Sequence, residues 1–394
     1  MMNNQDAVSL RIAMLRFLMI FGIVLLHAPP YVPLAEVANT PFDLLKAFFQ
    51  HAVFRTTVPV LTFISGYLLF RSALDRRPAQ LAQKKFRTIV VPFLVFNIGL
   101  LAAALTLHHA WGIQLSNNMI PADGKAWLDA AFGLTEAPIN YPLKFLRDLL
   151  ALMMVAPLLG YLLRRNPWLG LALMSLIYQF DLDRDFVLRN EMWPVFYCGG
   201  LAAVRNWNMR ALDRHAPLCL ALFLGMCACI VWFRLHDTRL LRLVAPVLIW
   251  PAASLLVPTA VGRWMARMSK YSFFIFVTHA PLLLVTMLVY TPFAAYVPYP
   301  VYWVLAPVVT SALLVGAFRL LMWTVPGLFS IVFGSRPMVR PARQAPLPLQ
   351  GSARWERAPQ AEVLYATPGD YRIMKPQNRE QDAELVGQQL QRAA

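Results

Sequence analysis

Arg16 and His27 are the first residues whose spacing indicates chemistry, because both interrupt an otherwise apolar run. Eleven residues make close to three turns of α-helix, so both side chains share one face, about 16 Å apart along the axis. An imidazole titrates near neutral pH and suits general-base or nucleophilic work. Taken alone, an arginine that only snorkels and a histidine that only caps the helix explain the pair equally well.

Other ionisable side chains also interrupt apolar stretches, and each is a functional candidate because charge is costly inside a membrane. They are His51, Arg55, Arg147, Asp148, Glu191, His279 and Arg319. We expect the first five to lie near the outer surface, where they are candidates for an acceptor site. His279 lies about 13 Å into its helix. A lone buried histidine there is more often a hydrogen-bonded core residue than a catalyst.

Lys84 and Arg87 form a basic pair just before an apolar run. They are three residues apart, so they share a face once a helix has begun. At the inner membrane edge such a pair suits the phosphates of a cofactor. The preference of cytoplasmic loops for positive charge explains the pair more simply.

Small and sulfur-containing residues in the apolar runs predict packing rather than chemistry. Ser65 and Gly66 allow close backbone approach between helices, and no nucleophile elbow surrounds Ser65. Cys227 and Cys229 have the wrong spacing for a zinc site, and no histidine is near. We therefore predict no metal site and no disulfide framework.

The composition indicates that the segments carrying these residues lie in a lipid bilayer rather than in water. The chain is 58% hydrophobic and 14% charged, whereas soluble domains are usually about a quarter charged. A soluble fold would expose large apolar patches. The net charge of +16 comes from clusters of Lys and Arg between apolar runs, which is typical of membrane proteins and argues against nucleic-acid binding.

Apolar segments predict an all-α polytopic membrane protein with about ten transmembrane helices and a disordered cytoplasmic C-terminal tail. The segments are 9–29, 47–70, 88–108, 143–163, 168–180, 191–204, 215–233, 240–258, 271–290 and 300–325. Basic loops alternate with loops poor in Lys and Arg, which places both termini in the cytoplasm. Arg234, Arg239 and Arg242 break this rule, because they fall on the predicted outer side.

The two ends of the chain are interpreted from their composition. Arg16 and the lack of a small-residue cleavage site before Pro29 argue against a cleavable signal peptide, so 9–29 is expected to be the first membrane helix. Residues 335–394 are polar and Pro-rich, which favours disorder. The predicted organisation is a transmembrane domain over 1–334 and a tail over 335–394.

Five motifs in order resemble acyltransferase family 3, the membrane-bound O-acyltransferases of bacterial glycans. They are Leu15-Arg16 to Leu26-His27, Val58-Pro59-Val60 to Ser65-Gly66-Tyr67, Lys84-x-x-Arg87, Leu143–Leu149 with Arg147 and Asp148, and Tyr271 to His279. Lys84 stands where the family usually has arginine, which keeps the charge but loses the bidentate fork. Lys144 stands where the family has an aromatic residue.

The resemblance implies an inner-membrane enzyme with acyl-CoA, first of all acetyl-CoA, as co-substrate and no cofactor. The acceptor would be a hydroxyl of an extracytoplasmic or lipid-linked glycan, such as exopolysaccharide or O-antigen. His27 would act as general base or form an acyl-histidine, Arg16 would steady the donor, and Lys84 with Arg87 would hold the phosphates of CoA.

Three alternatives stay open at this stage, as does the oligomeric state. One is a succinyltransferase of periplasmic glucans. Another is a transporter or flippase for a lipid-linked or small polar substrate, which should show two related halves, and no such repeat is found. A scaffold without chemistry is disfavoured by the number of costly ionisable groups.

Overall fold

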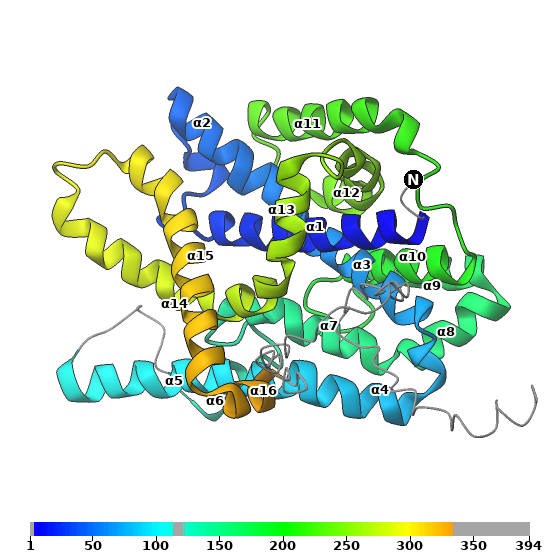
Figure 1. Cartoon of the computed structure of the whole chain (residues 1–394), viewed down its shortest axis with the longest axis horizontal. Helices are drawn as coiled ribbons and strands as arrows, with labels where there is room; N and C mark the ends of the chain where they lie inside the picture. Colours follow the sequence, from blue (N-terminus) through cyan, green and yellow to red (C-terminus); the bar gives the residue numbers. More distant parts are fainter. Residues whose placement is uncertain (1–3, 113–120, 122, 334–394) are drawn as a thin grey trace, which may run out of the picture. The chain divides into compact units, whose positions relative to one another are not determined.

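The computed structural model describes residues 4–112, 121 and 123–333, and the regular secondary structure of these residues is helical (Figure 1). The helices are α1 (Asn4–Leu26), α2 (Pro41–Ala47), α3 (Thr57–Arg71), α4 (Pro78–Lys85), α5 (Val91–Trp111), α6 (Gly124–Phe132), α7 (Lys144–Met154), α8 (Ala156–Arg165), α9 (Pro167–Phe180), α10 (Met192–Val204), α11 (Ala216–Trp232), α12 (Arg239–Ala252), α13 (Ala260–Met268), α14 (Ser272–Tyr290), α15 (Tyr299–Thr324) and α16 (Pro326–Phe333). The predicted tail over 335–394 lies outside the described residues.

Six helical stretches of the described chain are long and apolar enough to cross a membrane. They are Gln5–Leu26, Pro41–Arg71, Pro78–Ala110, Asp213–Trp232, Ala260–Phe293 and Tyr299–Thr324. A seventh crossing exists if α7 and α8, which bend by 56° at their junction, form one span. A polytopic helical membrane protein is therefore confirmed, whereas ten crossings stay a prediction.

Proline and helix length explain why the remaining predicted spans are interrupted. Pro157 occupies the first turn of α8, where the missing N–H cannot continue α7. Two prolines, Pro246 and Pro251, lie inside α12, which has 14 residues. Helices α9 and α10 have only 14 and 13 residues, short of the about 20 that span a bilayer without distortion.

Helix α1 lies at the centre of the transmembrane unit. It packs against α3, α13, α14 and α15, and α13 crosses it in Figure 1. Its N-terminal half is fixed by Arg11, which is 3% exposed and forms a two-pronged ion pair with Asp213 at 2.8 and 2.6 Å. Arg11 also lies over the ring of Trp250 at 5.3 Å. The helix that carries Arg16 and His27 is thus held at its start by a partly buried ion pair.

The crossing of α3 and α10 confirms the close approach predicted for Ser65 and Gly66. A Cβ atom at Gly66 would lie 2.2 Å from the carbonyl oxygen of Phe196, and one at Gly199 would lie 2.2 Å from that of Phe63. The Ser65 hydroxyl donates to the carbonyl of Leu61 at 2.7 Å, within its own helix. The packing interpretation of this motif accounts for both residues.

Replacing Gly66 with alanine should destabilise the protein, because the added methyl meets backbone atoms that cannot move independently. The expected cost is about 1–3 kcal/mol, as in other overpacked cores. Gly225→Ala is the matched control, since nothing lies within 4 Å of that Cβ position and alanine favours helix by about 1 kcal/mol. Thermal unfolding in detergent measures both, and an unchanged Tm for Gly66→Ala contradicts the crossing geometry.

Candidate active site

His27 directly follows the last residue of α1, and a buried glutamine fixes the backbone around it. Gln50, 1% exposed, donates through Nε2 to the carbonyls of Leu25, Leu26 and Ala28 at 3.4, 3.3 and 3.0 Å. The last carbonyls of a helix have no partner within the helix. Gln50 supplies that partner from the π-helical turn Phe48–Ala52 and so sets where His27 leaves α1.

The segment after His27 is also tied down at several carbonyls. The ammonium of Lys46 donates to Pro30 at 2.8 Å and lies 4.8 Å from the ring centroid of Tyr299. The hydroxyl of Tyr299 donates to the carbonyl of Pro29 at 3.1 Å. Two helices distant in sequence, α2 and α15, therefore hold the chain that emerges from His27.

His51 and Arg55, both predicted near an acceptor, are brought together by this same segment. The Nε2 of His51 lies 2.8 Å from the carbonyl oxygen of Val32, and its ring is 5.2 Å from that of Tyr31. Arg55 donates to the hydroxyl of Tyr31 at 2.8 Å. The π-helical turn and the 3-10 turn Val53–Thr56 place both residues against the loop rather than on one face of a regular α-helix.

His279 of α14 forms the most informative contact of His27. The Nδ1 atom of His27 lies 3.0 Å from Nε2 of His279, and the planes of the two rings are nearly parallel, with an interplanar angle of 8°. The other nitrogen of His279, Nδ1, lies 3.1 and 2.8 Å from the carbonyl oxygens of Ile275 and Phe276. His279 is fully buried, and its contacts with these two carbonyls of its own helix fix the orientation of its ring.

These distances assign the tautomers of both rings. Carbonyl oxygens only accept, so His279 must carry its proton on Nδ1 and present a lone pair at Nε2. His27 must then donate from Nδ1 to that lone pair. The lone pair of His27 is therefore at Nε2, which forms no hydrogen bond among the residues that the structure describes. A neutral imidazole held in this form is ready to accept a proton or to attack a carbonyl.

Tyr141 forms another wall beside His27, and two asparagines position it. Its ring stands edge-on to His27, with 4.8 Å between the centroids. Asn140 donates through Nδ2 to Val277 of α14 at 3.1 Å, and its backbone N–H donates to Oδ1 of Asn97 at 2.9 Å. The sequence interpretation missed this group because it considered ionisable side chains and not neutral amides in apolar helices.

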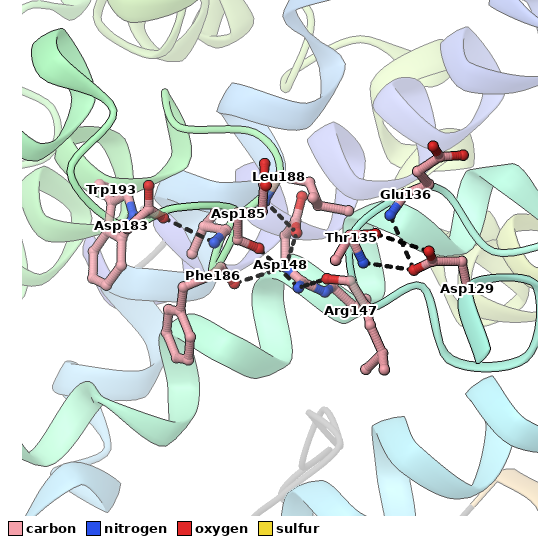
Figure 2. Close-up of polar contacts among 12 residues, drawn as sticks. Asp129, Thr135, Glu136, Arg147, Asp148, Asp183, Asp185, Phe186, Leu188 and Trp193 are labelled. Atoms are coloured by element: carbon pink, nitrogen blue, oxygen red, sulfur yellow. Dashed lines mark hydrogen bonds and ion pairs between the residues drawn. The ribbon is translucent and has the colours of Figure 1, made fainter. Parts of the chain in front are cut away.

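Arg147 and Asp148 lie together and join two loops (Figure 2). Arg147 donates to the carbonyls of Leu134, Asp185 and Phe186 at 2.7–2.9 Å and to Oδ1 of Asp148 at 3.0 Å. Asp148 also accepts the backbone N–H of Leu188 at 3.0 Å. Both residues were predicted as acceptor-site candidates. In the structure the guanidinium of Arg147 is already hydrogen-bonded to the loops that it joins.

Neighbouring carboxylates stabilise the same two loops. Asp129 accepts from the N–H and hydroxyl of Thr135 and from the N–H of Glu136 (Figure 2). Burial alone would raise the pKa of Asp129, but these hydrogen bonds lower it below the ordinary value. Asp183 accepts the indole N–H of Trp193 at 2.8 Å. These loops are therefore built around carboxyl groups that accept hydrogen bonds.

Two of the three arginines that broke the charge rule contact segments distant in sequence. Arg242 pairs with Glu191, a predicted acceptor-site candidate, at 3.1 Å. Arg234 donates to the carbonyl of Leu34 and to Oδ1 of Asn39, each at 2.7 Å. These contacts give the arginines a structural task that has nothing to do with membrane orientation.

Arg189 is a cation that the sequence interpretation did not single out. It interacts electrostatically with Asp148, Glu191 and His27. Burial lowers its pKa, and the two carboxylates oppose that shift. Within the described chain its guanidinium forms no hydrogen bond or ion pair. It lies in a loop between apolar helices, where an arginine gives no periodic signal.

Arg16 lies further back along α1, apart from the His27 cluster. It is partly buried and forms no ion pair or hydrogen bond with the residues described. Lys85, which directly precedes the π-helical turn Phe86–Val90, interacts electrostatically with Arg16 and Lys84. Arg87 is exposed in the same turn. The structure thus groups Arg16 with the predicted basic motif and adds Lys85 to it.

The cysteines are dispersed over two helices, α10 and α11. All four cysteines are free thiols. Among the described residues, no group of three His, Cys, Asp or Glu side chains could hold a metal ion.

Comparisons with known proteins identify the class of protein that carries this arrangement. A family model described as an acyltransferase domain, Acyl_transf_3, matches residues 10–323. The chain is 31% identical over 366 residues to "Succinoglycan biosynthesis protein ExoH" of Rhizobium meliloti (strain 1021), covering 88% of this chain and 96% of that relative. No solved structure matches. The chain belongs to this acyltransferase family, as its motifs predicted.

Removing the guanidinium of Arg147 should loosen the loops that it joins. We expect Arg147→Met to lower the Tm and to speed proteolysis within 133–140 and 181–190, because three loop carbonyls lose their donor at a cost of about 0.5–1.5 kcal/mol each. Arg239→Met is the matched control, since its ion pair with Asp237 is exposed at both partners. Equal stability of the two variants would show that Arg147 is free for another role.

Proposed function

We propose that this protein is an integral membrane O-acyltransferase that moves an acyl group from cytoplasmic acyl-CoA to a hydroxyl of an extracytoplasmic or lipid-linked glycan. Its family supports acyl transfer, and the printed name of its relative supports a polysaccharide acceptor. The observation that carries the proposal is His27, whose Nδ1–H is engaged by His279 and whose Nε2 has no hydrogen-bond partner among the described residues. The proposed location is a bacterial inner membrane with both termini in the cytoplasm.

In the general-base route, Nε2 of His27 takes the proton of the acceptor hydroxyl while its oxygen attacks the thioester carbonyl. The tetrahedral intermediate then collapses, the C–S bond breaks, and the imidazolium returns the proton to the leaving thiolate. The hydrogen bond from Nδ1–H to His279 stabilises the charge that His27 acquires. His279 acts as a positioning residue, because it works only through His27.

An acyl-histidine route uses the same tautomer. Nε2 of His27 attacks the thioester, CoA thiolate leaves, and the acceptor hydroxyl then attacks the acylimidazole. Both routes require the lone pair at Nε2 and the proton at Nδ1. Rapid quenching with labelled donor separates them, because only the second route leaves label on the protein before an acceptor is added.

The donor is proposed to bind along the basic group formed by Arg16, Lys84, Lys85 and Arg87. Arg16 has no anionic partner among the described residues, and a buried unpaired charge is costly. A phosphate or the polarised thioester of acyl-CoA would supply that partner. Arg87 is exposed at the start of the span and would meet the phosphates first.

The acyl group is proposed to be acetyl, with succinyl as the second candidate. The observation that favours the second candidate is that Arg189 and Arg55 both interact electrostatically with His27. Such positive surroundings suit the terminal carboxylate of a succinyl group. Offering acetyl-CoA and succinyl-CoA in equal amounts and weighing the product decides between them. Membership of an acyltransferase family removes the support for a transporter.

Removing either histidine should reduce catalysis, but to different extents. His27→Ala should abolish transfer, while His279→Leu should lower kcat by about 10²-fold or more, within the range of general acid–base effects. His279→Gln keeps an acceptor for His27 and should retain more activity than His279→Leu. Initial rates with labelled acyl-CoA measure this.

His109→Ala is the control for the histidine variants, because that residue is exposed near the end of α5 and touches neither His27 nor His279. It should keep wild-type kcat. If His279→Leu also kept wild-type kcat while remaining folded, the positioning role of His279 would be wrong.

Removing Arg87 should weaken donor binding and leave the chemical step intact. We expect Arg87→Ala to raise the KM for acyl-CoA about tenfold, since losing a charge-assisted hydrogen bond costs about 1.5–3 kcal/mol. An acyl-pantetheine donor, which lacks the nucleotide, should show no such difference. Arg165→Ala is the control at another exposed arginine. An equal KM for acyl-CoA in wild type and Arg87→Ala excludes the phosphate role.

A further inference from the structure

A cavity of about 170 Å³ opens beside the segment that follows His27. It lies between the turn Leu34–Glu36 and the helical stretch that begins with α2. Its polar lining comprises Glu36, Asp43, Lys46, Gln50 and His51. Pockets for drug-sized ligands are larger, about 300–1,000 Å³, so this cavity suits one small unit of a larger molecule.

The donors that line the cavity are already used by the protein. Lys46 donates to Pro30, and the Nε2 atom of Gln50 faces three backbone carbonyls. Nε2 of His51 is engaged with the carbonyl of Val32. The lining therefore has few donors left to offer a ligand.

The acceptors that line the cavity remain available. The Glu36 carboxylate and the Oε1 atom of Gln50 have no hydrogen-bond partner among the described residues, although Gln50 is 1% exposed. Asp43 accepts from Thr40 through Oδ2, which leaves Oδ1. The Oε1 atom of Gln50 is not among the buried polar atoms that lack a partner, so a donor in the cavity that Gln50 lines can reach it.

We infer that this cavity binds one sugar unit of the glycan acceptor, a subsite that rests on the proposed function. A neutral polyhydroxylated ring supplies several O–H donors to the available acceptors and carries no charge that two carboxylates would repel. A metal ion fits less well, because the described residues contain no group of three metal-binding side chains. The ligand class is thus a neutral sugar.

The cavity is also placed to serve His27. Gln50 and His51 line it and at the same time hold the backbone on either side of residues 29–31. Val32 is five residues beyond His27, so the two are at most about 17 Å apart along an extended chain. A short run of sugar units would span that distance, with the reacting hydroxyl at His27 and a neighbouring unit in the cavity.

The test measures binding of neutral glucose and galactose tetrasaccharides to the full-length protein in nanodiscs, without acyl donor, by saturation-transfer NMR. The double variant E36Q/D43N keeps the shape of the cavity but weakens its acceptors, and Ala38→Phe fills it. Each should raise the Kd at least tenfold with an unchanged Tm. Asp237→Asn, an exposed carboxylate outside the cavity, should leave the Kd unchanged.

Acyl transfer to the same tetrasaccharides is measured separately, so that the sugar subsite and the proposed acyltransferase function can each be disproved without the other. Binding that depends on the cavity but leads to no acylation would overturn the proposed function and support the subsite. Acylation with a Kd insensitive to E36Q/D43N and to Ala38→Phe would overturn the subsite and leave the function standing. Absence of tetrasaccharide binding, or saturable Ca²⁺ binding that E36Q/D43N abolishes in its place, would also overturn it.

Discussion

The hydrogen bond between His27 and His279 joins the end of α1 to α14, two segments that are 252 residues apart in sequence. It can form only if α1 ends at Leu26, directly before His27, and if α14 places the buried imidazole of His279 beside that end. Gln50 sets the first condition by capping α1, and the backbone of α14 sets the second by fixing Nδ1 of His279. The reactive lone pair of His27 is a consequence of these backbone contacts.

Polar groups gather densely around that bond, and most of them hold backbone. Arg147, Arg234 and Lys46 each donate to main-chain carbonyls of loops near the ends of helices. Carbonyls that leave regular structure need donors wherever water is scarce. Rigid loops in turn keep the residues around His27 within hydrogen-bonding geometry, which general-base catalysis requires.

The sequence predicted the helical membrane architecture well, because length and apolar composition are local properties. Every predicted segment contains helix, but a bend at the start of α8 divides 143–163. The helices within 168–180, 191–204 and 240–258 are short, with 14, 13 and 14 residues. Membrane helices are recognised by composition, whereas breaks depend on how each backbone is satisfied in three dimensions.

For the site, the spacing of residues within one helix could be read from the sequence, whereas contacts between helices could not be predicted from it. The eleven-residue interval indicated Arg16 and His27, yet nothing local could pair His27 with His279 or reveal Gln50 as the cap of α1. Asn97, Asn140 and Arg189 were missed since their roles depend on distant partners. Arg234, Arg239 and Arg242 broke the predicted alternation of charge, and only the structure shows that Arg242 faces Glu191.

The tautomer of His27 is the most direct test of this account. Solid-state NMR of the full-length protein in lipid, with ¹⁵N-labelled histidine and His27→Ala for assignment, reports which ring nitrogen carries the proton. The account predicts a neutral His27 at pH 7.5 with the proton on Nδ1 and a bare Nε2, and loss of this preference in His279→Leu. A His27 protonated at Nε2, or one unaffected by His279→Leu, would contradict it.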